Sequence, residues 1–240
     1  MAGLSIGTSG WHYTHWRGPY YPEDMASDGM LEHYRRDFST VEINSSFYHL
    51  PSEATLADWR KTVPDGFCFS VKASRYITHM KKLKDFEEPV ATFLERVGLL
   101  EDRLGPVLFQ LPPRWHFNPP RLEAFLDGLP DGSRFVFEFR DPEWYDRRAF
   151  DMLSDHGAAL CLHDMQGSTT PREVTADFVY VRLHGPRTYG GAYDTQTLAG
   201  WAGAFSAWMR KGCDVFCYFN NDAKGHAVRN ARELKDMLHV

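Results

Sequence analysis

Three side chains suited to ion binding or acid–base chemistry alternate along one short stretch of the sequence. Tyr180, Arg182 and His184 are separated by single aliphatic residues, and Gly185 follows them. Successive side chains of a β-strand point to opposite faces, so this spacing predicts a strand with one apolar and one polar face. A guanidinium binds anions and an imidazole exchanges protons near neutral pH. The polar face is therefore typical of the inner wall of an enzyme barrel.

Other predicted strands carry polar residues at the same alternate positions, towards their C-terminal ends. These residues are Glu42 and Asn44, Ser70 and Lys72, Gln110, Glu138 and Arg140, His163, and Tyr218 and Asn220. The intervening positions hold large apolar side chains, as expected for a surface covered by helices. A shared binding or active site at one end of a parallel sheet would explain why the polar residues occupy equivalent positions in several strands.

The elements that must position these residues alternate along the whole chain. We predict strands at residues 4–7, 40–44, 67–72, 107–111, 135–140, 159–164, 179–184 and 215–220. Helices are expected at 28–37, 52–61, 87–102, 120–127, 147–156, 198–210 and from 225 to the C-terminus, with Ser52 as an N-cap. Eight strand–helix units of this length predict an α/β fold, a (β/α)₈ TIM barrel forming one domain over residues 1–240. An open doubly wound sheet is the alternative.

Enzymes with this fold place their chemistry at the C-terminal mouth of the barrel, where these polar residues are expected. We predict that Glu138 and His184 transfer protons to and from a small anionic ligand. Glu42 is the alternative base, and His79, in a loop beyond the third strand, is the alternative acid. The ligand's charge would be held by three cationic side chains, namely Lys72, Arg140 and Arg182.

A buried network of ion pairs is the alternative interpretation of the same charged residues. Charges taken out of water must be paired, and such a network would fill the barrel without catalysing anything. A metal ion is a further alternative, with Glu42, Glu138, His163, Asp164 and His184 as candidate ligands. Because lysine and arginine would crowd the same space, we predict no metal ligands, and the sequence identifies no cofactor.

The loops after the last two strands suggest where an anion would bind. They contain Arg187, Tyr189 and Lys224, together with Asn220 and Asn221, and several glycines. Barrels often bind phosphate at the loops after strands seven and eight, where glycines let backbone N–H groups approach. An ordinary loop without a ligand is the alternative.

The composition of the chain limits the classes of protein to which it can belong. The formal charge of −5 and the isoelectric point near 6.1 do not favour a generally basic nucleic-acid surface. No apolar run is long enough to span a bilayer, and no signal peptide is apparent, so we expect a cytoplasmic protein without membrane contact. The four cysteines form no C-x-x-C pair and are expected to be reduced.

Several segments together resemble one known family. They are Gly7-Thr8-Ser9-Gly10-Trp11, Val41 to Tyr48, Thr78-His79, Gln110-Leu111-Pro112-Pro113, Tyr180-x-Arg182-x-His184-Gly185 and Phe219-Asn220-Asn221. The chain resembles the DUF72 (YecE-like) family from its first strand to its last helix. The resemblance implies a TIM barrel that has been likened to endonuclease IV, and it implies no defined reaction. Many members resemble Arg-His-x-Ser-Trp after the fifth strand, where this chain has Arg140-Asp141-Pro142-Glu143-Trp144.

Three functional hypotheses follow. The favoured one is an enzyme that uses acid–base chemistry on a small anionic ligand, which could be phosphorylated. The alternatives are a nucleic-acid-binding or nuclease-like barrel, with or without a metal, and a scaffold without catalysis. The predicted ligand-binding residues are Trp11, Asn44, Tyr48, Lys72, Gln110, Arg140, Asp164, Arg182, Tyr189, Asn220 and Asn221.

Overall fold

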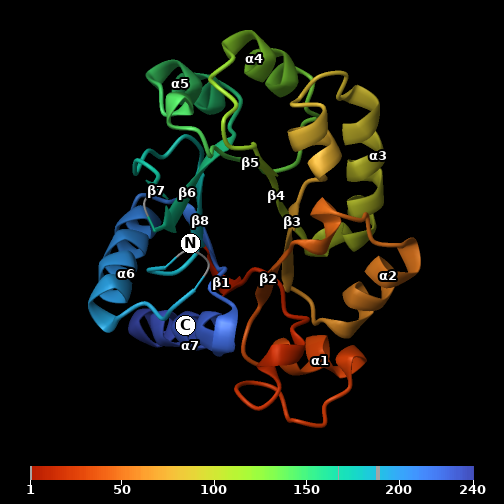
Figure 1. The fold of residues 1–240 in the computed structure, drawn as a ribbon, viewed down its shortest axis with the longest axis vertical. Helices are drawn as coiled ribbons and strands as arrows, with labels where there is room; N and C mark the ends of the chain where they lie inside the picture. Colours follow the sequence, from red (N-terminus) through yellow and green to blue (C-terminus); the bar gives the residue numbers. More distant parts are fainter. Residues whose placement is uncertain (1, 167, 188–189) are drawn as a thin grey trace.

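A closed barrel of parallel strands forms the centre of the molecule, as the sequence predicts (Figure 1). The computed structural model describes residues 2–166, 168–187 and 190–240. The barrel strands are β1 (Leu4–Thr8), β2 (Thr40–Ile43), β3 (Cys68–Lys72), β4 (Leu104–Gln110), β5 (Phe135–Glu138), β6 (Ala159–Met165), β8 (Phe178–Leu183) and β9 (Asp214–Phe219). Pairing runs in the order β1-β9-β8-β6-β5-β4-β3-β2. A parallel bridge between Ser9 and Glu42 joins the two ends, so an open sheet is excluded.

Helices surround the barrel in chain order, as Figure 1 shows. They are α1 (Met30–Tyr34), α2 (Glu53–Thr62), α3 (Glu87–Val97), α4 (Pro119–Asp127), α5 (Arg147–Asp155), α6 (Thr195–Arg210) and α7 (His226–Leu238). Ser52 caps α2 as predicted, because its hydroxyl accepts a hydrogen bond from the backbone N–H of Thr55 (3.1 Å). None of the helices in the described ranges is long and apolar enough to cross a membrane.

The predicted boundaries are wrong at several places. The helix predicted at 28–37 is a 3₁₀ turn at Ser27–Gly29 followed by the short α1. The helix predicted at 87–102 ends at Val97 and continues as a 3₁₀ segment, in which Glu101 has a φ of +51°. A π-helical turn at Tyr76–Met80 follows β3. Between β6 and β8, the described residues form the short β7 (Ser168–Thr169), which pairs antiparallel with β6.

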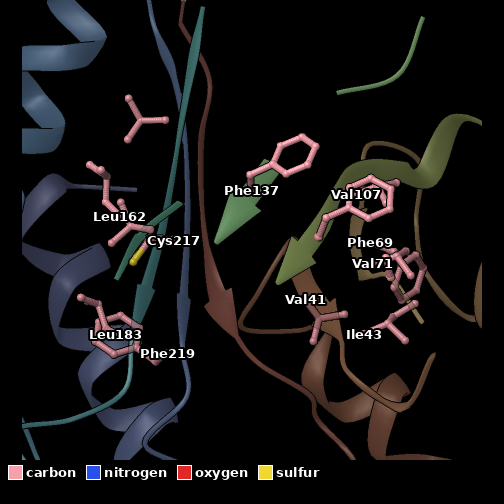
Figure 2. Close-up of a cluster of buried hydrophobic side chains, with 14 of the residues drawn as sticks. Val41, Ile43, Phe69, Val71, Val107, Phe137, Leu162, Leu183, Cys217 and Phe219 are labelled. Carbon is pink, nitrogen blue, oxygen red and sulfur yellow. The ribbon is translucent and has the colours of Figure 1, made fainter. Parts of the chain in front are cut away.

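Large apolar side chains point outward from the barrel strands and pack against the helices. Figure 2 shows Phe69 and Val71 from β3 directed away from the barrel, and Leu183 and Phe219 lying beside the helices on the opposite side. These side chains are at most 1% exposed. Their burial removes apolar surface from water and provides the main favourable contribution to folding.

The inward-facing positions form layers that become more polar towards the mouth. At the N-terminal end lie apolar and aromatic side chains, including Leu108, Val136 and Phe178. In the next layer the Tyr218 hydroxyl lies 2.7 Å from the hydroxyl oxygens of both Thr40 and Ser70. Charged side chains follow above them. The alternation seen in the sequence therefore separates an outer apolar surface from a polar interior.

Candidate functional site

A pocket of about 630 Å³ opens at the C-terminal end of the barrel. We call it the mouth pocket. It is lined by Tyr13, Asn44, Phe47, Tyr48, Lys72, Arg75, His79, Met80, Gln110, Arg140, Arg182, His184 and Asn220. Nine of these were predicted as site residues from sequence, and they come from strand ends and from the turns that follow β2 and β3. Four lining residues are cationic, and within the described part of the chain no carboxylate lines the pocket.

A chain of ion pairs forms the floor beneath the pocket. The Arg182 guanidinium donates to Glu42 (Nη2 to Oε1, 2.8 Å) and to Glu138 (Nη1 to Oε2, 2.6 Å). The guanidinium of Arg140 pairs with the other oxygen of Glu138. The side chains of Arg182 and both glutamates are at most 1% exposed. The charged residues of β2, β5 and β8 thus neutralise one another across the barrel interior.

Both carboxylates of this floor are occupied by donors. Glu42 also accepts hydrogen bonds from the hydroxyls of Tyr180 (2.7 Å) and Ser9 (2.5 Å). Burial alone would raise the pKa of Glu138, but the two neighbouring arginines lower that pKa well below its usual range. Glu138 is therefore ionised at neutral pH and poorly suited to accept a further proton.

His184 is held between two polar groups. Its Nε2 lies 3.3 Å from the Arg140 guanidinium, and its Nδ1 lies 3.0 Å from the side-chain amide of Asn220. Burial, and after it the positive charge of Arg182, lower the pKa of His184 well below its ordinary value. Because a guanidinium only donates, Nε2 of the neutral ring acts as an acceptor and its lone pair faces Arg140.

Lys72 differs from the two arginines in its surroundings. Its ammonium lies over the ring of Phe47, 4.2 Å from the centroid, and the side chain lines the mouth pocket. Among the described residues, neither a hydrogen bond nor an ion pair engages this ammonium. Burial, and secondly the charge of Arg182, lower the pKa of Lys72 to about 8. A lysine with that pKa can exchange a proton near neutral pH.

We expect Lys72→Met to stabilise the protein at pH 7. The folded protein holds the pKa of Lys72 at about 8, below the ordinary 10.5, so the buried charge opposes folding. Removing it should raise the free energy of unfolding by about 1–3 kcal/mol. Because the unfolded chain binds more protons between pH 8 and 10.5, this gain should shrink as pH rises through that window. Urea unfolding at pH 7 and pH 10 would measure both values, and a variant less stable than the parent at pH 7 would contradict the expectation.

Sequence reasoning missed part of the pocket wall. Tyr13, Phe47, Arg75 and Met80 all line the mouth pocket, although none was predicted as a site residue. Arg75 immediately precedes the π-helical turn and Met80 ends it. Their proximity to the Thr78-His79 motif was the available signal, but a turn of this kind has no sequence pattern that assigns its side chains to a pocket.

Within the same turn, His79 packs edge-on against Phe47, with ring centroids 5.0 Å apart. Its Nδ1 lies 2.9 Å from the Thr78 hydroxyl. Burial, and secondly the charge of Lys72, lower the pKa of His79 to about 4, so the ring is neutral at pH 7. Contact with the same ring, that of Phe47, therefore places His79 and Lys72 in the same part of the pocket.

Some predicted ligand-binding residues do not line the mouth pocket. Trp11 packs edge-on against Trp59 (centroids 4.9 Å apart) and lines an adjoining pocket of about 460 Å³. Asn221 is fully buried and donates to the Gly191 carbonyl oxygen (2.8 Å), which gives it a structural part. Asp164 is partly exposed, and burial raises its pKa. Tyr189 lies outside the described residues.

The anion site predicted at the loops after β8 and β9 stays a prediction. Arg187 is exposed there, and Lys224 is exposed at a 3₁₀ turn with a φ of +55°. Three cations that line the mouth pocket lie instead on β3, on β8 and just after β5. The geometry therefore offers two separate locations for an anion at the same end of the barrel.

One trio of side chains could hold a metal ion at the rim. His116 Nδ1 lies 3.1 Å from a carboxylate oxygen of Glu143 and 3.5 Å from one of Asp141. All three ligand atoms lie within 4.8 Å of one another. The chemistry of one imidazole and two carboxylates suits several divalent ions, but exposed groups of this kind are also ordinary ion pairs. Glu42 and Glu138, two of the candidate ligands in the metal alternative, are instead paired with arginine.

Comparisons with known proteins agree with this fold. The structure of a DUF72 family protein from Thermotoga maritima superimposes with a TM-score of 0.90 and 27% identity, covering 99% of this chain and 100% of that one. The protein YunF of Bacillus subtilis is 26% identical over 99% of this chain and 95% of its own length. YecE of Escherichia coli strain K12 is 36% identical over 130 residues, which cover 53% of this chain and about half (47%) of YecE.

A family model covers nearly the whole chain. The model described as "Protein of unknown function DUF72" matches residues 5–240. All the barrel strands except the first residue of β1, Leu4, and every described residue of the mouth pocket fall within that match. The chain therefore belongs to the DUF72 family.

Proposed function

We propose that the mouth pocket binds a small anionic ligand and that Lys72 exchanges a proton with it. The observation that supports this most directly is the position of the Lys72 ammonium, which lines the pocket without an anionic partner among the described residues. A buried charge is costly unless it is paired. An anion entering the pocket would supply the missing partner.

The charge balance supports the same proposal. The floor and wall contain two carboxylates, Glu42 and Glu138, against three cations, Arg182, Arg140 and Lys72. Arg75 adds a fourth positive charge to the pocket lining. A carboxylate, a sulfate or a phosphate group would offset this excess. Asn44, Gln110 and Asn220 also line the pocket and carry amides that can bind further polar atoms.

The surroundings of Glu138 and His184 favour roles for these residues other than the proton transfer predicted from sequence. Glu138 is ionised and lies between two arginines, so we propose that it orients them towards the ligand. His184 stays neutral next to Arg140, and we propose that it supports the same guanidinium. Lys72 has a pKa of about 8 and is the better candidate for proton transfer near neutral pH.

Nucleic-acid binding is the second candidate function, and exposed aromatic residues favour it. The side chains of Tyr48 and Tyr76 are 63% and 43% exposed, close in sequence to the cationic pocket residues Lys72 and Arg75. Aromatic rings next to cations can stack bases of a single strand while the cations bind phosphate. Tight oligonucleotide binding with a steep salt dependence would favour this candidate over a small ligand.

We expect phosphate and sulfate to bind the parent protein, and Lys72→Met to weaken that binding at least tenfold. A tenfold loss corresponds to about 1.4 kcal/mol, a reasonable value for one cation in contact with an anion. Isothermal titration calorimetry at pH 7 with each anion would measure it. The matched control is Lys224→Met, which removes a lysine from the loop after β9 and should leave the affinity unchanged.

The opposite result for the two lysine variants would place the anion site elsewhere. If Lys224→Met abolished binding while Lys72→Met did not, the anion would bind at the loops after β8 and β9. If the parent bound neither anion at millimolar concentration, the proposed anion pocket would be wrong.

A further inference from the structure

We propose that Lys72 is a nucleophile that forms an imine with a small aldehyde or ketone carrying a carboxylate or phosphate group. This inference rests on the proposed anion pocket and names the class of ligand that would enter it. It follows from where the amine lies, which groups surround it and which groups are kept away from it.

The amine meets the geometric requirement for attack on a ligand. Lys72 ends β3 at an inward-facing position, and its side chain lines the mouth pocket, which at about 630 Å³ has room for a small metabolite. The face of Phe47 lies against one side of the ammonium, 4.2 Å from the ring centroid to Nζ. A fixed amine facing an open pocket can approach a bound carbonyl carbon directly.

The surroundings favour the neutral amine that such chemistry needs. A protonated lysine has no lone pair, and lysine nucleophiles are activated by burial or by a second cation nearby. Both conditions hold here, since burial and the charge of Arg182 lower the pKa of Lys72 to about 8. The two buried carboxylates, which would otherwise hold the proton on Lys72, are instead engaged by Arg182 and Arg140.

The remaining pocket residues match the other parts of the ligand. The guanidinium of Arg140 and the rim residue Arg75 would hold its anionic group. The amide of Gln110 can donate to the carbonyl oxygen as negative charge develops on it. The imidazole of His79, packed against Phe47, stays neutral and so adds no positive charge beside the amine.

The proposed reaction is balanced and needs no oxidant. The lone pair of Lys72 Nζ forms a bond to the carbonyl carbon, and the carbonyl π electrons move to oxygen, which takes up a proton. The nitrogen gives one proton to solvent water, which replaces the proton taken up by the oxygen. The nitrogen lone pair then forms the second carbon–nitrogen bond as the carbon–oxygen bond breaks, and the oxygen takes up the second nitrogen proton and leaves as water. A carbon–nitrogen double bond remains, so one carbonyl compound and one amine give one imine and one water.

Borohydride trapping tests this inference. The full chain is incubated with dihydroxyacetone phosphate or with glyoxylate, reduced with sodium borohydride, digested and mapped by mass spectrometry. We expect an adduct on Lys72 at least tenfold more abundant than on Lys82 or Lys84, which are exposed. Dihydroxyacetone, which lacks the phosphate, should label Lys72 at least tenfold less. A preference for one of the two anionic probes would show whether phosphate or carboxylate is the better anchor.

A conservative variant separates this inference from the proposed anion pocket. Lys72→Arg keeps the positive charge but cannot form an imine, so it should still bind phosphate in calorimetry and give no adduct at position 72. If the parent binds phosphate but only Lys82 and Lys84 are labelled, the imine is wrong and the anion pocket stands. If phosphate does not bind and Lys72 is not labelled, both are wrong.

Discussion

Replacing Arg182 with methionine should lower the free energy of unfolding by about 3–5 kcal/mol, because two buried glutamates lose their shared partner. The Arg182 guanidinium lies 2.8 Å from Glu42 and 2.6 Å from Glu138, and all three side chains are at most 1% exposed. Since domains of this size are typically stable by about 5–15 kcal/mol, the variant should still fold. Urea unfolding at pH 7, followed by circular dichroism, would measure the loss.

The loss should depend on pH in a defined direction. In the parent, the pKa of Glu138 in the folded protein is well below the ordinary 4.5. Its contribution to stability is therefore complete above pH 4.5 and is lost as the pH falls through the lower pKa of the folded protein. Without Arg182, burial favours the protonated carboxyl. The deficit of the variant should therefore be smaller at pH 4 than at pH 7.

A partly exposed ion pair provides the matched control. Arg134 lies 2.7 Å from Asp214, with side chains 40% and 29% exposed. Arg134→Met should cost only about 0–1 kcal/mol, because solvent screens such a pair. If both methionine variants lost the same small amount, the ion pairs beneath the mouth pocket would not stabilise the barrel in the way described.

Gly185→Ala should cost about 3 kcal/mol or more, because it adds a backbone clash to an unfavourable backbone conformation. Gly185 follows β8 with a φ of +96°, and an added Cβ would lie 2.4 Å from the Gly190 carbonyl oxygen. Backbone atoms cannot move aside as a flexible side chain can. The neighbouring His184 would shift with the loop, so phosphate affinity should fall as well.

Another glycine isolates the contribution of the clash. Gly212 has a similar φ of +91°, but an added Cβ there would meet no atom within 4 Å. Gly212→Ala should therefore cost only about 1–2 kcal/mol, the penalty for the left-handed conformation alone. Thermal unfolding of both variants would measure the difference, and equal melting temperatures would contradict the close contact at Gly185.

The barrel itself could be predicted because its signal repeats along the chain. Each strand alternates large apolar residues with polar ones, as in Val41-Glu42-Ile43 and Phe137-Glu138-Phe139. That period of two assigns one face to the helices and the other to the interior, whatever the exact boundaries are. The membership of the mouth pocket follows from the same parity, which explains why Lys72, Arg140 and His184 were assigned correctly to one end of the barrel.

The pairing between individual cations and carboxylates could not be predicted in the same way. Sequence shows that Glu138, Arg182 and Lys72 share a face, but not which cation lies within hydrogen-bonding distance of which carboxylate. Those distances depend on the positions of strands that are far apart in the chain. They decide that Arg182 neutralises both glutamates and that Lys72 is left facing the pocket. Arg75 was missed because a π-helical turn has no distinctive residue pattern.

A crystal structure of the protein soaked in phosphate would test the proposed anion site most directly. The geometry predicts phosphate density within hydrogen-bonding distance of Lys72 Nζ and the Arg140 guanidinium, above the ion pairs formed by Arg182. Density found only beside Arg187 and Lys224, with the mouth pocket free of phosphate, would contradict that placement and favour the loops after β8 and β9.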